Sequence, residues 1–190
     1  TICRYYLVPY LNKFHKQFPH VHIKVTNQTS IACASLLEHG QVDFIVVNYP
    51  NSALSSTHIP RVINEFHDVF VANRQYFPLD GREVSLASLQ KYPILMLDRK
   101  STTSEFLHSM FQRSHLDLVP EIELSSNDLL IDLARIGLGI AFVPDFCIPA
   151  DDKDLFVVKL KEELPKRQMV VAYNERMPLS QTAKQFMSML

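Results

Sequence analysis

Residues 125–144 constrain the fold more than any other part of this chain. The segment reads SSNDLLIDLARIGLGIAFVP and holds two of the chain's four glycines, Gly137 and Gly139. Before the glycines, leucine and isoleucine recur at the spacing of one helix face. After them, an apolar run over residues 140–143 stops at Pro144. We therefore predict a helix, a glycine in the left-handed conformation that ends it, and a buried strand.

The rest of the chain repeats this alternation. Apolar residues at helical spacing predict helices over residues 2–18, 85–89 and 102–114, and from Pro178 to the end of the chain. A further helix is predicted to be opened by residues 27–30 and to stop at Gly40. Short apolar or alternating runs predict strands at residues 21–25, 44–47, 68–72, 94–97, 122–124, 140–143, 156–160 and 168–173. Strands that alternate with helices indicate an α/β fold with parallel-rich sheets. Ligands of such folds bind at the carboxyl ends of the strands.

Composition excludes several classes of protein. The chain has 190 residues with 19 basic and 20 acidic side chains, a net charge of −1, which argues against a nucleic-acid-binding surface. No apolar run reaches the length of a membrane span, so we expect no membrane contact. Cys3, Cys33 and Cys147 form no CxxC pair, which indicates reduced thiols in a cytoplasmic protein. Motifs for nucleotide cofactors are absent too, so we expect no cofactor.

Five segments, in order along the chain, carry a family resemblance: LVPYLNKFHKQFPHVHIKV, LLEHGQVDFIVV, DVFVAN, VSLASLQKYPILMLD and SSNDLLIDLARIGLGIAFVP. Together they resemble the effector-binding (regulatory) domain of LysR-type transcriptional regulators. The resemblance implies the two-lobed fold of type-2 periplasmic binding proteins. Lobe I would comprise residues 1–73 and 145–190, and lobe II residues 74–144. A small, anionic effector would bind in the cleft between the lobes.

The resemblance also implies partners. The bacterial regulator would be a homodimer, and possibly a tetramer at full length. It would contact DNA only through a winged helix-turn-helix, which we expect to be missing from this chain together with the first strand of lobe I. Effector binding would then modulate DNA binding and transcription. We accordingly expect the chain to be a fragment of a longer protein.

Candidate effector contacts are hydroxyl groups at predicted helix starts, where small anions bind. There are three hydroxyl clusters: Thr29 and Ser30; Ser101, Thr102 and Thr103; and Ser125 and Ser126. The cationic Arg99 and Lys100 adjoin the second cluster, and Phe142 is a candidate contact for an apolar part of the effector. Each has an ordinary alternative. The hydroxyls could be helix caps only, and Ser125 with Asp128 and Thr102 with Glu105 match the capping box. Arg99 and Lys100 could be a solvated loop pair, and Phe142 could be core.

Other functions have weaker support. The chain lacks the GxSxG, HExxH, P-loop and GxGxxG motifs, so we predict no catalytic residues and a ligand sensor instead of a small α/β enzyme. A solute-binding protein of a transporter shares the fold and is the alternative, but the chain is short for that class. His20 and His22 could share a strand face, yet they lack a nearby third ligand, and we predict no metal. Cys147 could be a redox sensor, although no resolving cysteine is evident.

Overall fold

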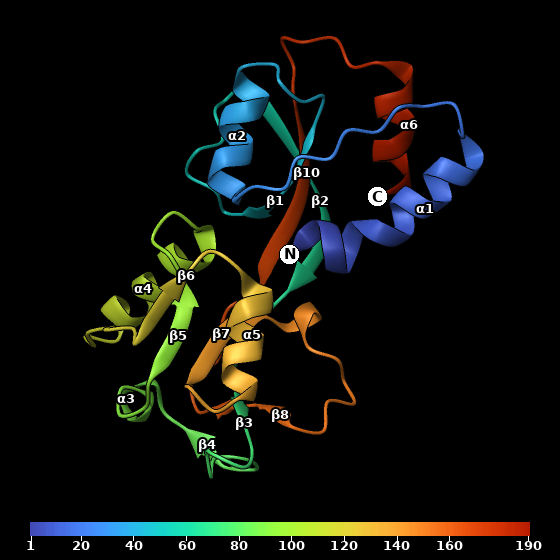
Figure 1. Ribbon diagram of the computed structural model, residues 1–190. Coiled ribbons are helices and arrows are strands. Elements are labelled where there is room, and N and C mark those ends of the chain that lie inside the picture. Colours follow the sequence, from blue (N-terminus) through green and yellow to red (C-terminus); the bar gives the residue numbers. More distant parts are fainter. The chain divides into compact units, whose positions relative to one another are not determined.

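The computed structural model describes residues 1–190 and divides them into two compact units (Figure 1). The first unit comprises Thr1–Glu65 and Arg167–Leu190, and the second comprises Phe66–Lys166. Each unit is a sheet with helices packed on its faces. No helix in the structure is both long enough and apolar enough to span a membrane.

A three-stranded sheet forms the centre of the first unit. Its order is β1 (Ile45–Tyr49), β10 (Arg167–Asn174) and β2 (His58–Phe66). Strand β1 runs antiparallel to β10, with Val47 opposite Val170. Helix α2 (Ser30–Glu38) covers one face of this sheet because its Ala34 and Leu37 pack against apolar side chains of β1 and β10.

Two further helices complete the first unit. A π-helical turn, η1 (Cys3–Leu7), leads into α1 (Val8–Gln17), and α6 (Gln181–Met189) ends the chain. Phe14 of α1 meets Phe186 of α6 edge to face, with ring centroids 5.1 Å apart, which joins the two helices. Helices were expected in both places. The last one begins after its cap at Ser180, and not at Pro178 as predicted.

A five-stranded sheet forms the centre of the second unit, in the order β6-β5-β7-β3-β8. The strands are β3 (Asp68–Asn73), β5 (Ile94–Leu97), β6 (Ile122–Leu124), β7 (Ile140–Pro144) and β8 (Leu155–Val157). A small parallel pair, β4 (Glu83–Val84) and β9 (Lys159–Leu160), lies in the same unit. A short 3₁₀ turn, η2 (Asp145–Cys147), follows β7.

Helices cover both faces of this sheet. Helices α3 (Leu86–Leu89) and α4 (Thr102–Arg113) share a buried cluster with Ile94 and Met96 of β5. Helix α5 (Asn127–Arg135) packs against β3, β5 and β7. Successive strand residues point to opposite faces, so alternate residues of β5 contact α4 and α5. This explains why all four residues of β5 are buried and apolar.

The sheets are mixed, and not parallel-rich as predicted. Strand β5 runs parallel to β6 and β7, but β3 runs antiparallel to β7 and β8, as β1 does to β10. A continuous apolar run indicates that both faces of a strand are buried. It does not indicate the direction of the neighbouring strand.

Two other expectations differ from the structure. Residues 21–25 form no strand, and Ile23 and Val25 are 38% and 51% exposed, so their alternation marks no buried face. Conversely, β2 was not expected from the sequence. Strand β3 pairs with β7 and β8, so residues 66–73 and 145–166 lie in the second unit.

Candidate functional site

Two parallel strands of the second unit end at the same edge of the sheet. Leu97 of β5 lies opposite Leu124 of β6, and the backbone N–H of Asp98 donates to the carbonyl oxygen of Leu124 at 2.9 Å. Helix α4 begins five residues after β5 ends, and α5 begins three residues after β6 ends. The amino ends of α4 and α5 therefore lie near the same sheet edge, which we call the carboxyl edge.

Ser101 caps α4. Its Oγ accepts a hydrogen bond from the backbone N–H of Ser104 at 3.1 Å and donates to the carbonyl oxygen of Asp98 at 3.0 Å. The capping box predicted at Thr102 and Glu105 is therefore wrong by one residue. Thr102 and Thr103 are buried inside the first turn. Because the Ser101 hydroxyl hydrogen is already engaged, this side chain offers a ligand only its remaining acceptor capacity.

Ser126 caps α5. Its Oγ accepts a hydrogen bond from the backbone N–H of Leu129 at 3.3 Å. Ser125 is exposed and is not the cap, so the capping box predicted at Ser125 and Asp128 is also shifted by one residue. An N-cap hydroxyl uses an oxygen lone pair and keeps its own hydrogen. The Ser126 hydroxyl donates no hydrogen bond in the structure, so its hydrogen is available to an anion.

The loop between β5 and α4 carries two cations. Arg99 and Lys100 are both exposed, and Asp98 Oδ1 accepts from the backbone N–H of Lys100 at 3.0 Å, which shapes the loop. The side chains contribute positive potential beside the amino end of α4. Asp98 offsets part of it. Their geometry is compatible both with a ligand contact and with the solvated pair considered from the sequence.

Ser104 also belongs to the first turn of α4. It is buried, and its Oγ has no hydrogen-bond partner. Buried hydroxyls are normally paired, so an unpaired one beside a helix start marks a place for a water or a ligand atom. Sequence reasoning missed Ser104. Its position directly after the Thr102–Thr103 pair was the available signal.

Phe142 offers no accessible surface to an effector. Its side chain is 0% exposed and packs against Phe70 and Phe106, with ring centroids 4.7 and 6.4 Å away. The alternative considered from the sequence, core packing, accounts for this residue. Phe142 is therefore not retained as an effector contact.

A second set of polar groups surrounds the start of α2 in the first unit. Thr29 caps the helix, with Oγ1 accepting from the backbone N–H of Ala32 at 3.2 Å. Ser30 Oγ accepts from the backbone N–H of Asn48 at 3.1 Å, and Asn51 Nδ2 donates to the carbonyl oxygen of Ser30 at 2.8 Å. These bonds attach the start of α2 to the carboxyl end of β1.

Asn48 is the most informative member of this set. The residue is only 9% exposed, yet its side-chain Oδ1 has no partner. A buried amide oxygen without a donor costs free energy, so a ligand N–H or O–H, or a water, would be favoured beside it. Asn51 was missed from the sequence because its contact with Ser30 spans 21 residues.

Burial controls the chemistry of Cys147 in η2. The side chain is buried, and loss of solvation raises the pKa of its thiol to about 12. Reactive cysteines need a thiolate, which this environment disfavours at neutral pH. The structure therefore favours the inert reading of Cys147 over the redox sensor. His20 and His22 lie outside any strand, so they do not share the strand face that a metal pair required.

The chain matches the family model of the LysR substrate binding domain over residues 1–190. The protein belongs to this family, and the mixed α/β architecture agrees with that assignment. The family and the α/β fold expected from the sequence are thus confirmed, with mixed sheets in place of parallel-rich ones.

Relatives and solved structures agree. The chain is 23% identical to the transcriptional activator CmpR of Synechocystis over 100% of its length and 62% of that protein. It is 22% identical to the regulator CysB of Burkholderia cenocepacia, over 83% of this chain and 50% of that protein. The chain thus spans about half to two thirds of these relatives.

Two solved structures share the fold. The regulatory domain of Synechocystis CcmR in complex with 2-PG superposes with a TM-score of 0.88 at 19% identity, over 100% of this chain and 93% of that one. The effector binding domain of QuiR in complex with shikimate superposes with a TM-score of 0.83 at 15% identity, over 99% of this chain and 90% of that one. At these identities the likeness establishes the fold alone.

Proposed function

We propose that this chain is the ligand-sensing domain of a transcriptional regulator and that it binds a small anionic metabolite. One observation carries the proposal: two helices, α4 and α5, begin near the same carboxyl edge, and the Ser126 hydroxyl there has a free hydrogen. Each helix start carries a partial positive charge and N–H groups without helical partners. Two such starts at one edge favour an anion more than either would alone.

Three further features support an anion at this edge. Arg99 and Lys100 add positive charge, although both side chains are solvated. Ser104 Oγ is buried without a partner. Proteins of similar fold bind small molecules, 2-PG in CcmR and shikimate in QuiR. The proposed contacts in the second unit are therefore Ser101, Thr102, Thr103, Ser125 and Ser126, with Arg99 and Lys100.

Thr29 and Ser30 are proposed to contact the same effector. The start of α2 presents the same chemistry as the starts of α4 and α5, with hydroxyl groups at a helix amino end. The unpaired Asn48 Oδ1 beside Ser30 adds an acceptor, which suits an effector that carries a hydroxyl or amine as well as its anionic group.

The regulatory output is proposed to follow from differential binding. An effector shifts a protein between arrangements only by as much as it prefers one of them. In this proposal the chain works as a homodimer, and DNA is contacted by another segment of the full regulator. The role assigned to the 190-residue chain is binding, without turnover of the effector.

A screen of thermal stability tests the proposal. The chain is heated with small carboxylates, phosphorylated acids, aromatic acids, amino acids and inorganic oxyanions, and with an uncharged analogue of each positive compound. An effector at a hundred times its dissociation constant should stabilise the folded chain by about 2.7 kcal/mol. We expect at least one anion to act and its uncharged analogue to fail. Stabilisation only by neutral or cationic compounds would contradict the proposal.

A further inference from the structure

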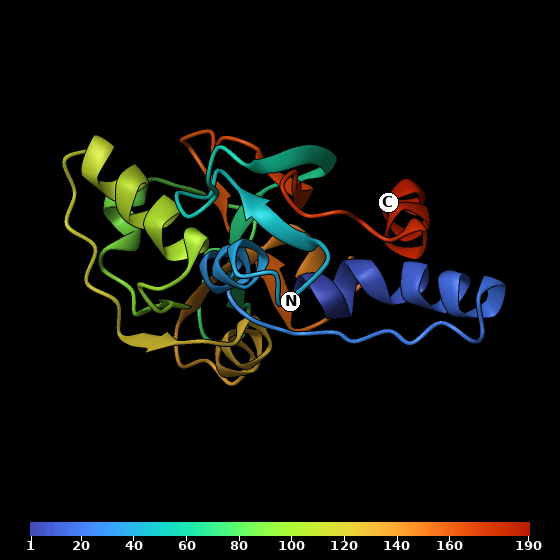
Figure 2. The ribbon, with the colours of Figure 1, turned by 90° about the horizontal axis from the view of Figure 1, so that it is seen from above.

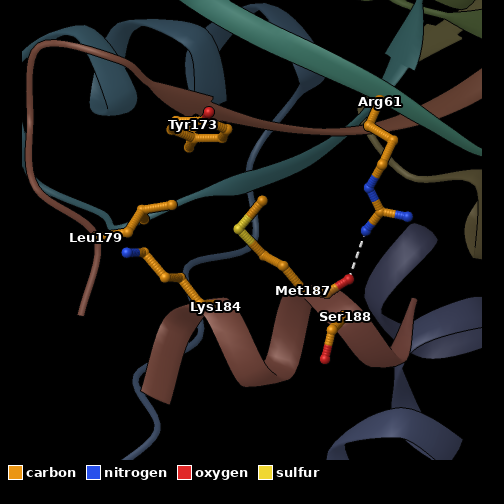
Figure 3. A pocket seen from close by; sticks show the side chains of 6 residues that line it. All are labelled: Arg61, Tyr173, Leu179, Lys184, Met187 and Ser188. Carbon is orange, nitrogen blue, oxygen red and sulfur yellow. Dashed lines mark hydrogen bonds between the residues drawn. The ribbon is translucent and has the colours of Figure 1, made fainter. Parts of the chain in front are cut away.

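A cavity of about 650 Å³ lies in the first unit, and none of the residues proposed above to contact the effector lines it (Figure 3). Its lining comes from β2, β10, α6 and the segment before α6: Arg61, Tyr173, Leu179, Lys184, Met187 and Ser188. The volume falls within the range of roughly 300–1,000 Å³ that is usual for small-molecule sites. We propose that this cavity binds an organic acid with an apolar body.

The centre of the cavity is apolar. Figure 3 shows the Met187 side chain extending from α6 into the space between helix and strands, with Leu179 and the ring of Tyr173 on one side of it. Met187 is buried, and Leu179 and Tyr173 are half-buried. A thioether adapts to differently shaped apolar ligands. We call these three side chains the apolar floor of the cavity. The apolar floor favours an alkyl chain or a ring over an inorganic ion.

The charge at the cavity is positive. Arg61 and Lys184 line it from opposite sides of Met187, and no acidic side chain lines it (Figure 3). The Ser188 hydroxyl donates to the carbonyl oxygen of Gln185 at 2.7 Å and is therefore already used. An apolar floor flanked by two cations selects a carboxylate or related anion and disfavours an amine.

Arg61 is held in place before any ligand arrives. Its Nη2 donates to the carbonyl oxygen of Met187 at 2.5 Å, in the last turn of α6, and the same oxygen accepts a longer bond of 3.4 Å from the backbone N–H of Leu190. A guanidinium has more N–H donors than this one bond uses, and its planar fork suits a carboxylate. The bond thus positions the group beside the apolar floor while leaving donors for an anion.

Methyl NMR tests this inference at the cavity itself. The chain is labelled with [¹³C-methyl]methionine, and the Met187 signal is assigned by its loss in Met187→Leu. The probe is octanoate. Two control compounds are tested beside it: propionate has a carboxylate but only a short apolar chain, and 1-octanol has the long apolar chain but no charge. We expect octanoate to shift the Met187 methyl signal saturably, and the two controls to bind at least about fivefold more weakly.

Matched variants separate charge from shape. Lys184→Gln and Arg61→Gln should each raise the octanoate dissociation constant by roughly fivefold or more, because a charge-assisted contact is lost. Lys24→Gln, an exposed lysine in the same unit, should leave it unchanged. Lys184 is exposed, so Lys184→Gln keeps the test valid even if Arg61→Gln, which also loses the bond to Met187, destabilises the fold.

Several results would overturn the inference. They are an unshifted Met187 signal at millimolar octanoate, equal binding of 1-octanol, or unchanged affinity in Lys184→Gln. The inference does not depend on the proposed effector site. Ser126→Ala should leave octanoate binding intact, and failure at either site leaves the other standing.

Discussion

The backbone N–H of Asp98 donates to the carbonyl oxygen of Leu124 at a distance of 2.9 Å. This bond joins the carboxyl ends of β5 and β6, although β6 begins 25 residues after β5 ends. This bond brings the starts of α4 and α5 to one sheet edge. Neither helix start by itself distinguishes an anion site from an ordinary cap. Their meeting at one edge is the structural basis of the proposed function.

We expect Ser126→Ala to weaken effector binding more than Ser101→Ala. The Ser126 hydroxyl hydrogen is free, whereas that of Ser101 is bonded to Asp98. Losing either cap should cost about 1 kcal/mol of stability. Isothermal titration with the effector found in the screen measures the difference. Ser85→Ala, which removes the cap of α3, is the control and should not change affinity. Equal affinity in all three variants would reduce these hydroxyls to caps.

Ser30→Ala tests the contribution of the first unit. The substitution leaves the backbone N–H of Asn48 without its acceptor, so stability should fall by about 1 kcal/mol. If Ser30 contacts the effector, affinity should also fall at a pH and temperature where the variant is fully folded. Ser35→Ala, on the exposed side of the same helix, is the control. A loss of stability with unchanged affinity would confine Ser30 to a structural role.

Gly137→Ala should destabilise the second unit strongly. Gly137 has φ +82°, and a Cβ there would lie 2.5 Å from the ring of Tyr76. Gly81→Ala is a matched control, because Gly81 also has a positive φ of +72° but nothing lies near its added Cβ. Backbone strain alone costs about 1 kcal/mol, so chemical denaturation should show that loss for Gly81→Ala and at least twice as much for Gly137→Ala. Equal losses would show that Tyr76 moves aside freely.

Acid should weaken the second unit through Asp152. Arg135 donates to both carboxylate oxygens of Asp152, at 3.1 and 2.9 Å, and this pairing lowers the pKa of Asp152 to about 2 from an ordinary 3.8. The carboxylate therefore stabilises the folded state above about pH 4, and that contribution is lost as pH falls toward 2. Melting temperatures between pH 5 and 2 should fall more steeply in the parent protein than in Asp152→Asn. Parallel curves would contradict this assignment.

Sedimentation velocity at micromolar concentration should show a homodimer. Val8, in the first turn of α1, is 52% exposed, which suits a surface that a partner covers. Val8→Asp should raise the dimer dissociation constant about tenfold or more, since burying an unpaired carboxylate is costly. The control is Val119→Asp, at a valine that is 83% exposed in a loop of the second unit. A parent chain that remains monomeric would refute the dimer.

The sequence by itself determined the local elements and the family. Gly137 ends its helix with positive φ as expected, and the order of quoted segments was enough to identify the LysR resemblance. Apolar spacing located nearly all helices because helix formation depends on neighbours three and four residues away. Caps were displaced by one residue because several adjacent hydroxyls compete for the same position.

Tertiary structure alone decided the rest. Whether β1 pairs parallel or antiparallel depends on β10, which lies more than a hundred residues later in the chain. Phe142 became core because Phe70 and Phe106 close around it. Arg61, Tyr173 and Lys184 come from separate elements and share a cavity only after the sheet and α6 have packed. Such sets arise from long-range packing, for which residue spacing along the chain carries no signal.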